Sequence, residues 1–131
     1  MFIDASALTA ILISEEDGPE LLARIQNGRT RITSALAVWE TTVAISRKME
    51  YSVQRAADQV EEFLTLLGID VVAVEPAARK FAIEAYDRFG KSRHKAALNF
   101  GDCFAYACAR HAGVPLLYKG DDFPQTDIET A

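Results

Sequence analysis

The first eight residues, MFIDASAL (residues 1–8), join a predicted strand directly to a predicted helix. The apolar run Met1–Ile3 predicts a short buried strand, and the small and apolar residues from Ala5 onward predict a helix. Asp4 stands at the junction, where an aspartate is a favoured helix N-cap. A strand that leads straight into a helix is therefore the first structural prediction, and the same pattern recurs downstream.

The alternation of strand and helix continues along the whole chain. Further strands are predicted within residues 29–33, 69–74 and 114–118, and a short last strand includes Ile128. Helices are predicted over residues 5–14, 20–26, 35–49, 53–67, 76–89 and 99–111. This order indicates an α/β domain with a mostly parallel sheet, and the near-continuous apolar strands predict helices on both faces. Ligands of such sheets bind beyond the carboxyl ends of the strands.

Size and composition favour one domain that spans residues 1–131. No apolar run reaches the roughly 18 residues needed to cross a bilayer, and the N-terminus lacks the basic region of a signal peptide. We therefore expect a cytoplasmic protein that does not enter a membrane. Cys103 and Cys108 lie five residues apart in a helical segment, so we expect free buried thiols and no zinc site.

The net charge of −5 conceals a basic segment. Residues 88–119 carry 6 basic side chains and 1 acidic one, a net charge of +5. The basic residues are Arg88, Lys91, Arg93, Lys95, Arg110 and Lys119. A local basic surface attracts phosphate whatever the total charge of the protein. The alternative is a solvated loop whose charges serve only solubility.

Asp4 and Glu40 are acids in apolar surroundings. An isolated buried carboxylate costs several kcal/mol or more, so it shifts its pKa, finds a partner or holds a cation. Asp4 has a structural explanation as a helix cap, in which Ser6 could hydrogen-bond the carboxylate and fix its rotamer. Glu40 shares a predicted helical face with apolar side chains, and its alternative explanation is an ion pair with Arg47.

Two further acidic positions follow in the C-terminal third. Asp102 lies among small and apolar residues, where the helix dipole could stabilise it. Gly101 beside it would let a ligand or backbone approach closely. The pair Asp121-Asp122 follows the last apolar strand and also fits an ordinary turn. Asp121 comes sooner after the strand end, so we predict it to be the fourth acid of the site.

Acids that converge from several elements repel one another unless a cation lies between them. Mg²⁺ prefers oxygen ligands and is often held by few carboxylates. Such a metal site can activate water and bind a phosphate for in-line displacement. Together with the basic segment, the acids predict hydrolysis of a phosphodiester. No Gly-rich phosphate loop is present, and no organic cofactor is expected.

The four acidic positions lie in the segments FIDASAL (residues 2–8), Glu40, LNFGDC (residues 98–103) and LYKGDDF (residues 117–123). In this order they resemble PIN-domain ribonucleases and, more narrowly, the VapC-type toxins of bacterial toxin–antitoxin pairs. The resemblance implies a three-layer α/β/α sandwich with a central, mostly parallel sheet. It also implies a Mg²⁺- or Mn²⁺-dependent endoribonuclease, a homodimer, and a small VapB-type antitoxin that covers the acidic groove.

The resemblance assigns roles to individual residues. The predicted catalytic residues are Asp4, Glu40, Asp102 and Asp121, with Asp122 as the alternative to Asp121. The predicted metal ligands are Asp4, Asp102 and Asp121, while Glu40 either joins the metal shell or orients the attacking water. Charge, and not the resemblance, gives the candidates for contacts with RNA phosphates, which are Arg93, Lys95 and Lys119.

Two other classes of function stay open at this point. A phosphoacceptor signalling domain is also small, acidic, α/β and Mg²⁺-binding, but it would place adjacent acids near the first strand, whereas Asp4 stands alone. A catalytically silent α/β binding module would use the same acids only for structure. Labelling of an aspartate by acetyl phosphate would favour the first class, and a lack of Mg²⁺ binding would favour the second.

Overall fold

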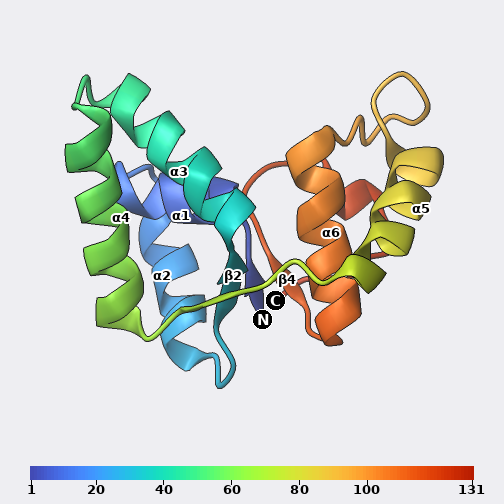
Figure 1. The fold of residues 1–131 in the computed structure, drawn as a ribbon, viewed down its shortest axis with the longest axis horizontal. Helices are drawn as coiled ribbons and strands as arrows, with labels where there is room; N and C mark the ends of the chain where they lie inside the picture. The colour runs from blue at the N-terminus through green and yellow to red at the C-terminus, as the bar shows by residue number, and fades with distance from the viewer.

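Four short parallel strands form the centre of the protein in a computed structural model that describes residues 1–131. The strands are β1 (Phe2–Ile3), β2 (Ile32–Ser34), β3 (Asp70–Val72) and β4 (Leu116–Leu117), in the spatial order β3-β2-β1-β4 (Figure 1). Phe2 of β1 lies opposite Ile32 on one side and Leu116 on the other. The predicted α/β class with a parallel sheet is confirmed.

Helices form a layer on each side of this sheet (Figure 1). One layer contains α1 (Ala5–Leu12), α2 (Gly18–Asn27), α3 (Ala35–Lys48) and α4 (Val53–Leu67). The other contains α5 (Arg79–Phe89), preceded by the short turn η1 (Pro76–Ala78), and α6 (Phe100–Ala112). A second short turn, η2 (Phe123–Gln125), lies in the C-terminal segment. None of the helices has the length and apolarity needed to span a membrane.

Alternate strand residues supply the two halves of the core. Phe2 and Leu116 pack into a cluster with residues of α5 and α6. Ile3 and Leu117 pack into a second cluster with residues of α1 to α4. All four side chains are fully buried, as the period-two geometry of strands between two helical layers requires.

Strand β3 does not follow the prediction that helices cover both faces. Asp70 and Val71 are exposed, and Val71 keeps 48% of its surface accessible. The cause is the position of β3 at one edge of the sheet, because α6 packs against β1 and β4 at the other end.

Local caps fix where the predicted helices begin and end. Ser34 accepts a hydrogen bond from the Ala37 amide, and Ser52 accepts one from the Arg55 amide. Gly68 ends α4 in the left-handed conformation that glycine adopts without a steric penalty. These contacts place the helix ends, and through them the side chains at the carboxyl edge of the sheet.

The predicted last strand around Ile128 is wrong. Only one parallel bridge forms there, between Leu116 and Thr130. The Ile128 amide donates to the Thr126 hydroxyl instead of to a neighbouring strand, at 3.2 Å. The pairing is confined to Leu116, whose amide donates to the Glu129 carbonyl and whose carbonyl accepts from the Ala131 amide.

Candidate active site

A cleft of about 420 Å³ opens beyond the carboxyl ends of β1 and β4, beside α3 and the first turn of α6. It is lined mainly by polar side chains, which include Asp4, Ser6, Glu15, Glu40, Lys48, Asp102 and Lys119. We call it the acidic cleft. It unites three of the predicted catalytic acids, which come from three separate elements and lie up to 98 positions apart in the sequence, from Asp4 to Asp102.

Asp4 forms the floor of the acidic cleft, with only 4% of its surface exposed. Its Oδ2 accepts hydrogen bonds from the Ser6 amide at 3.0 Å and from the Ser6 hydroxyl at 2.5 Å. Ser6 therefore fixes the carboxylate rotamer, as predicted. Burial raises the pKa of Asp4, and the hydrogen bonds from Ser6 oppose that rise. Ser6 Oγ also accepts from the Lys119 amide at 3.0 Å, which ties Asp4 to the end of β4.

Glu40 projects from α3 into the same space and has no hydrogen-bond or ion-pair partner. The alternative explanation, a pair with Arg47, is therefore absent. Burial raises the pKa of Glu40, and the charges of Asp4 and Asp102 raise it further. A Cβ added at Gly101 would overlap the Glu40 carboxylate. The glycine thus allows the close approach that the sequence predicted, and the approaching group is this acid.

Asp102 occupies the first turn of α6 in a reciprocal capping box. Its Oδ2 accepts from the Asn99 amide at 2.8 Å, and Asn99 Oδ1 accepts from the Asp102 amide at 3.0 Å. Burial raises the pKa of Asp102; the Asn99 hydrogen bond lowers it, while the charges of Asp4 and Asp122 raise it. The capping box holds one carboxylate oxygen and leaves Oδ1 available to the cleft.

The fourth acid is less closely placed. Asp121 and Asp122 are both exposed, they follow Gly120 at a φ of 106°, and neither lines the acidic cleft. Of the two, Asp122 is the residue whose charge acts on Asp102. This electrostatic effect favours Asp122 as the fourth acid, although Asp121 stands one residue nearer to the strand end.

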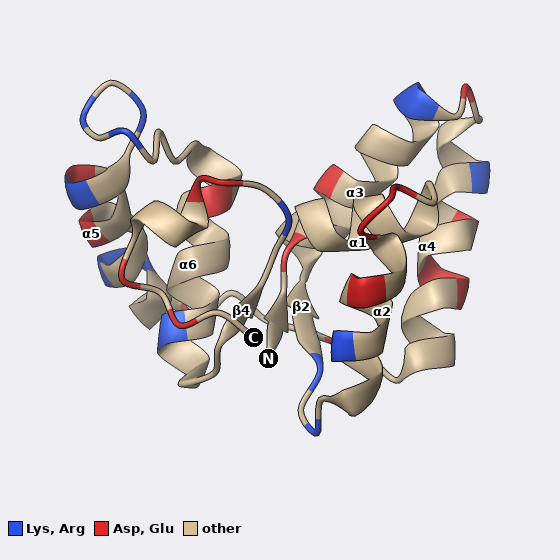
Figure 2. Ribbon diagram, turned by 180° about the vertical axis from the view of Figure 1, so that it is seen from behind, with Lys and Arg blue, Asp and Glu red and all other residues tan.

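The three candidates for phosphate contacts lie in different places. Arg93 and Lys95 belong to the loop that follows α5, which stands out as basic in Figure 2. This loop is closed by a bridge between residues 90 and 98, and it does not line the acidic cleft. Arg93 forms an ion pair with Asp87 at 2.6 Å. Only Lys119 lines the cleft, and its ammonium group pairs with acids of the segment between α1 and α2.

Glu15 and Lys48 line the cleft and were not found from the sequence. Lys48 Nζ lies 3.1 Å from Glu15 Oε1. A signal for Lys48 existed, because Glu40, Ala44 and Lys48 recur at four-residue spacing on one face of α3. Glu15 gave no such signal, since it stands in a run of acids between two helices and its neighbours are set by tertiary packing.

Comparison with known proteins then gives the family. Residues 1–129 match the PIN domain family. Ribonuclease VapC30 of Mycobacterium tuberculosis is 38% identical to this chain over 130 residues, which cover 99% of this chain and 97% of the relative. The chain belongs to the VapC family of PIN-domain proteins. Ribonuclease VapC of Mycolicibacterium smegmatis is also 38% identical, over 98% of this chain and 97% of its own length.

A solved VapC structure confirms the fold. The crystal structure of Mycobacterium tuberculosis VapC20, a toxin that cleaves the sarcin–ricin loop, superposes with a TM-score of 0.77. The match covers 99% of this chain and 97% of VapC20 at 18% sequence identity. The three-layer α/β/α sandwich that the resemblance implied is therefore the fold of this VapC chain.

The acids of this VapC chain suit a hard cation by their chemistry. No three of its His, Cys, Asp and Glu side chains are gathered tightly enough to form a ready-made metal site. Asp4, Glu40 and Asp102 are nevertheless all oxygen donors at one cleft, and neighbouring negative charge raises the pKa of Glu40 and Asp102. A divalent cation would relieve this repulsion, and oxygen donors are what Mg²⁺ and Mn²⁺ prefer.

Proposed function

We propose that this protein is a metal-dependent endoribonuclease and the toxin of a toxin–antitoxin pair. One observation carries the proposal: Asp4, Glu40 and Asp102 line a single cleft at the carboxyl edge of the sheet, and the pKa of each is raised. Clustered acids with perturbed pKa values are typical of functional sites. The names of the VapC relatives, which are ribonucleases, support the same conclusion.

The proposed metal site is formed by aspartates from separate elements of the fold. Asp4 and Asp102, with Asp122 or the predicted Asp121, would hold Mg²⁺, for which Mn²⁺ is a close substitute. When bound, the metal lowers the pKa of a coordinated water and stabilises negative charge on the phosphate. Ser6 and Asn99 keep the first two carboxylates in fixed rotamers.

We assign the role of proton acceptor to Glu40. It has no competing partner, and its raised pKa makes it a better proton acceptor than an ordinary glutamate. It takes a proton from the attacking water, whose oxygen forms a bond to phosphorus. The bond from phosphorus to the 3′ oxygen breaks, and that oxygen takes a proton from a solvent water, which leaves a 5′-phosphate and a 3′-hydroxyl.

The direct test is cleavage of structured RNA in the presence of Mg²⁺ by the wild type and by Asp4→Asn, followed by sequencing of the new 5′ ends. We expect the wild type to cut at defined positions and the variant to lose this activity. Mg²⁺ should also raise the Tm of the wild type more than that of the variant, since only a bound metal stabilises the fold. A wild type that neither binds Mg²⁺ nor cuts RNA would instead be a silent binding module.

We further propose that the protein forms a homodimer through the α5–α6 layer. A groove of about 670 Å³ lies between α5 and the start of α6, and its lining includes Ile83, Tyr86 and Phe100. All three are exposed, Ile83 and Phe100 at 68% each. Exposed apolar side chains that cluster in this way favour a protein interface. Light scattering should give a dimer mass for the wild type and a monomer mass for Phe100→Glu.

The proposed regulator is a small VapB-type antitoxin that covers the acidic cleft, and the proposed location is the cytoplasm, where cellular RNA lies. The VapC names of the relatives support an antitoxin partner. Two buried free thiols, Cys103 and Cys108, suit a reducing compartment. Co-expression with a short reading frame found beside the gene for this protein, if it encodes such an antitoxin, should yield a complex in which RNA cleavage is blocked.

A further inference from the structure

Two lysines at one end of the acidic cleft converge on a single carboxylate. Lys48, the last residue of α3, places Nζ 3.1 Å from Glu15 Oε1. Lys119, two residues after β4, pairs with Glu15 Oε2 and lies 3.0 Å from Asp17 Oδ1. We call this group the Lys48–Glu15–Lys119 bridge. It joins three elements that are far apart in the sequence, and all three of its members line the cleft.

The bridge has the geometry with which two lysines would bind a phosphate group. Each oxygen of the Glu15 carboxylate receives one ammonium group, which is how two lysines would bind the two free oxygens of a phosphodiester. The side chains remain partly open to solvent, with 54% of Lys48 and 26% of Glu15 exposed. Ion pairs at such exposure add little to stability, so exchanging the carboxylate for a phosphate costs little.

The bridge is held at a fixed place relative to the acids. The Lys119 amide donates to Ser6 Oγ, and the same hydroxyl donates to Asp4 Oδ2. Lys48 lies on the face of α3 that carries Glu40, two turns or about 12 Å further along the axis. An RNA strand whose reacting phosphate lies at the acids therefore extends a neighbouring phosphate toward the two lysines.

We propose that Lys48 and Lys119 bind an RNA phosphate next to the scissile one, and that Glu15 occupies the place of that phosphate in the free protein. This inference rests on the proposed endoribonuclease function. The contact is to the RNA backbone, so it adds affinity and register without reading sequence. The two ammonium groups also supply positive charge in a cleft whose other end is acidic. Without them, the cleft would repel a polyanion such as RNA.

Binding to a catalytically disabled protein tests the inference. In the Asp4→Asn background with Mg²⁺ present, a labelled RNA stem–loop is titrated at several salt concentrations. Lys48→Ala should weaken binding by about threefold to tenfold and reduce the slope of log K against log salt by about 0.7. The matched control is Lys80→Ala, which removes the same charge from an exposed position on α5 away from the cleft and should change neither quantity.

Glu15→Gln should change RNA affinity in the opposite direction to Lys48→Ala. It therefore distinguishes the proposed role from a purely structural one. Removing the competing negative charge should strengthen RNA binding by about twofold to fivefold, a gain that disappears when Lys48→Ala is added. If the bridge served only to anchor the segment between α1 and α2, Glu15→Gln would lower the Tm and leave or weaken RNA binding.

The outcomes separate this inference from the proposed function. Cleavage by the wild type together with unchanged RNA binding and salt dependence in Lys48→Ala would overturn the phosphate contact and leave the nuclease intact. A wild type that fails to cleave any RNA would overturn the nuclease. Weaker binding in Glu15→Gln would overturn the role of Glu15 as the displaced group.

Discussion

The protein contains two groups of carboxylates along α6, one at its first turn and one beside Tyr106 and Arg110, and the two groups have opposite electrostatic surroundings. In the acidic cleft, Asp4, Glu40 and Asp102 have no cationic partner, and the pKa of each is raised. In the C-terminal segment, Asp127 is surrounded by donors and its pKa is lowered. Carboxylates therefore lack cationic partners at the proposed active site, whereas Asp127, which has a structural role, is paired with cations and hydrogen-bond donors.

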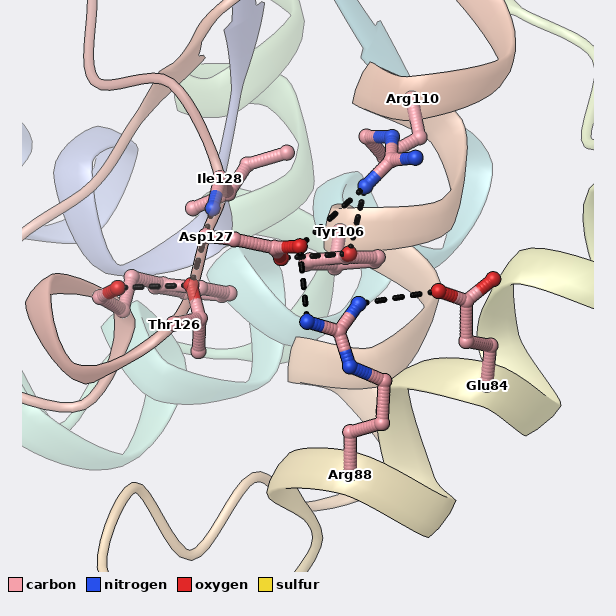
Figure 3. Close-up of polar contacts among 8 residues, drawn as sticks. Glu84, Arg88, Tyr106, Arg110, Thr126, Asp127 and Ile128 are labelled. Carbon is pink, nitrogen blue, oxygen red and sulfur yellow. Dashed lines mark hydrogen bonds and ion pairs between the residues drawn. The ribbon is translucent and has the colours of Figure 1, made fainter.

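Figure 3 shows how the paired carboxylate is held. The Tyr106 hydroxyl donates to Asp127 Oδ1 at 2.8 Å, and Arg88 binds Oδ2 at 2.9 Å. Arg110 donates to the Tyr106 hydroxyl, and Arg88 also pairs with Glu84. Burial raises the pKa of Asp127, but these hydrogen bonds outweigh it. The contacts fasten the C-terminal segment to α5 and α6.

The largest predicted difference between the two groups is in activity. Asp102→Asn should lower the rate of RNA cleavage by about 10³-fold, because it removes a charged metal ligand while an amide oxygen can still serve the capping box. Asp127→Asn, measured at a temperature where it stays folded, should keep a rate near that of the wild type. Equal losses of cleavage rate in both variants would show that the two groups of carboxylates do not differ in function.

Gly101→Ala should reduce cleavage by about tenfold to 100-fold, since the new methyl group displaces the Glu40 carboxylate from its position. Alanine is the better helix former, so thermal stability should not fall with activity. The check is a double-mutant cycle: in a Glu40→Ala background, Gly101→Ala should have no further effect on the rate. A further loss there would show that the methyl group acts on something other than Glu40.

Asp127→Asn should lower the free energy of unfolding by about 0.5–1 kcal/mol at neutral pH, because hydrogen bonds from Arg88 and Tyr106 are weakened and solvent screens this partly exposed group. Asp127 has a lowered pKa in the folded state, so its contribution is present above the usual value of 3.8 and is lost as the pH falls below it. Urea unfolding at neutral and acidic pH should show the gap between variant and wild type closing in acid.

Glu40→Gln should have an effect of similar size and opposite sign, raising the free energy of unfolding by about 0.5–1 kcal/mol at neutral pH in the absence of metal. Its pKa is raised in the folded state, so ionised Glu40 destabilises the fold above that pKa, and the penalty vanishes as the pH falls toward the usual value of 4.5. The gain from Glu40→Gln should therefore fade on acidification. Glu61→Gln, on the exposed face of α4, is the control and should give no gain.

The sequence was most informative where structure is set by neighbours along the chain. The Asp4 cap and the predicted helices over residues 35–49, 53–67 and 99–111 follow from local backbone chemistry, because Ser34 and Ser52 cap helix starts and Gly68 and Gly113 end helices. Family resemblance added the order of the acids. Together these features were sufficient for the fold and for the three acids that line the cleft.

Contacts that depend on tertiary packing were beyond the sequence. The bridge from Lys48 to Glu15 spans 33 positions, and no periodicity connects them. The choice between Asp121 and Asp122 depends on how the turn after Gly120 directs each side chain. In place of the strand predicted at Ile128, a single bridge forms at Thr130 and the Ile128 amide bonds the Thr126 hydroxyl, local contacts that apolarity alone does not reveal.

The two ends of the chain lie side by side in Figure 1, at the amino ends of the central strands. Phe2 donates to the Pro115 carbonyl, and Ala131 donates to the Leu116 carbonyl, so both ends are anchored at the start of β4. The cleft opens at the opposite edge of the sheet. A purification tag, a surface tether or a fluorescent pair can therefore be attached at either or both ends without obstructing RNA, and a pair of dyes there would report unfolding as a loss of energy transfer.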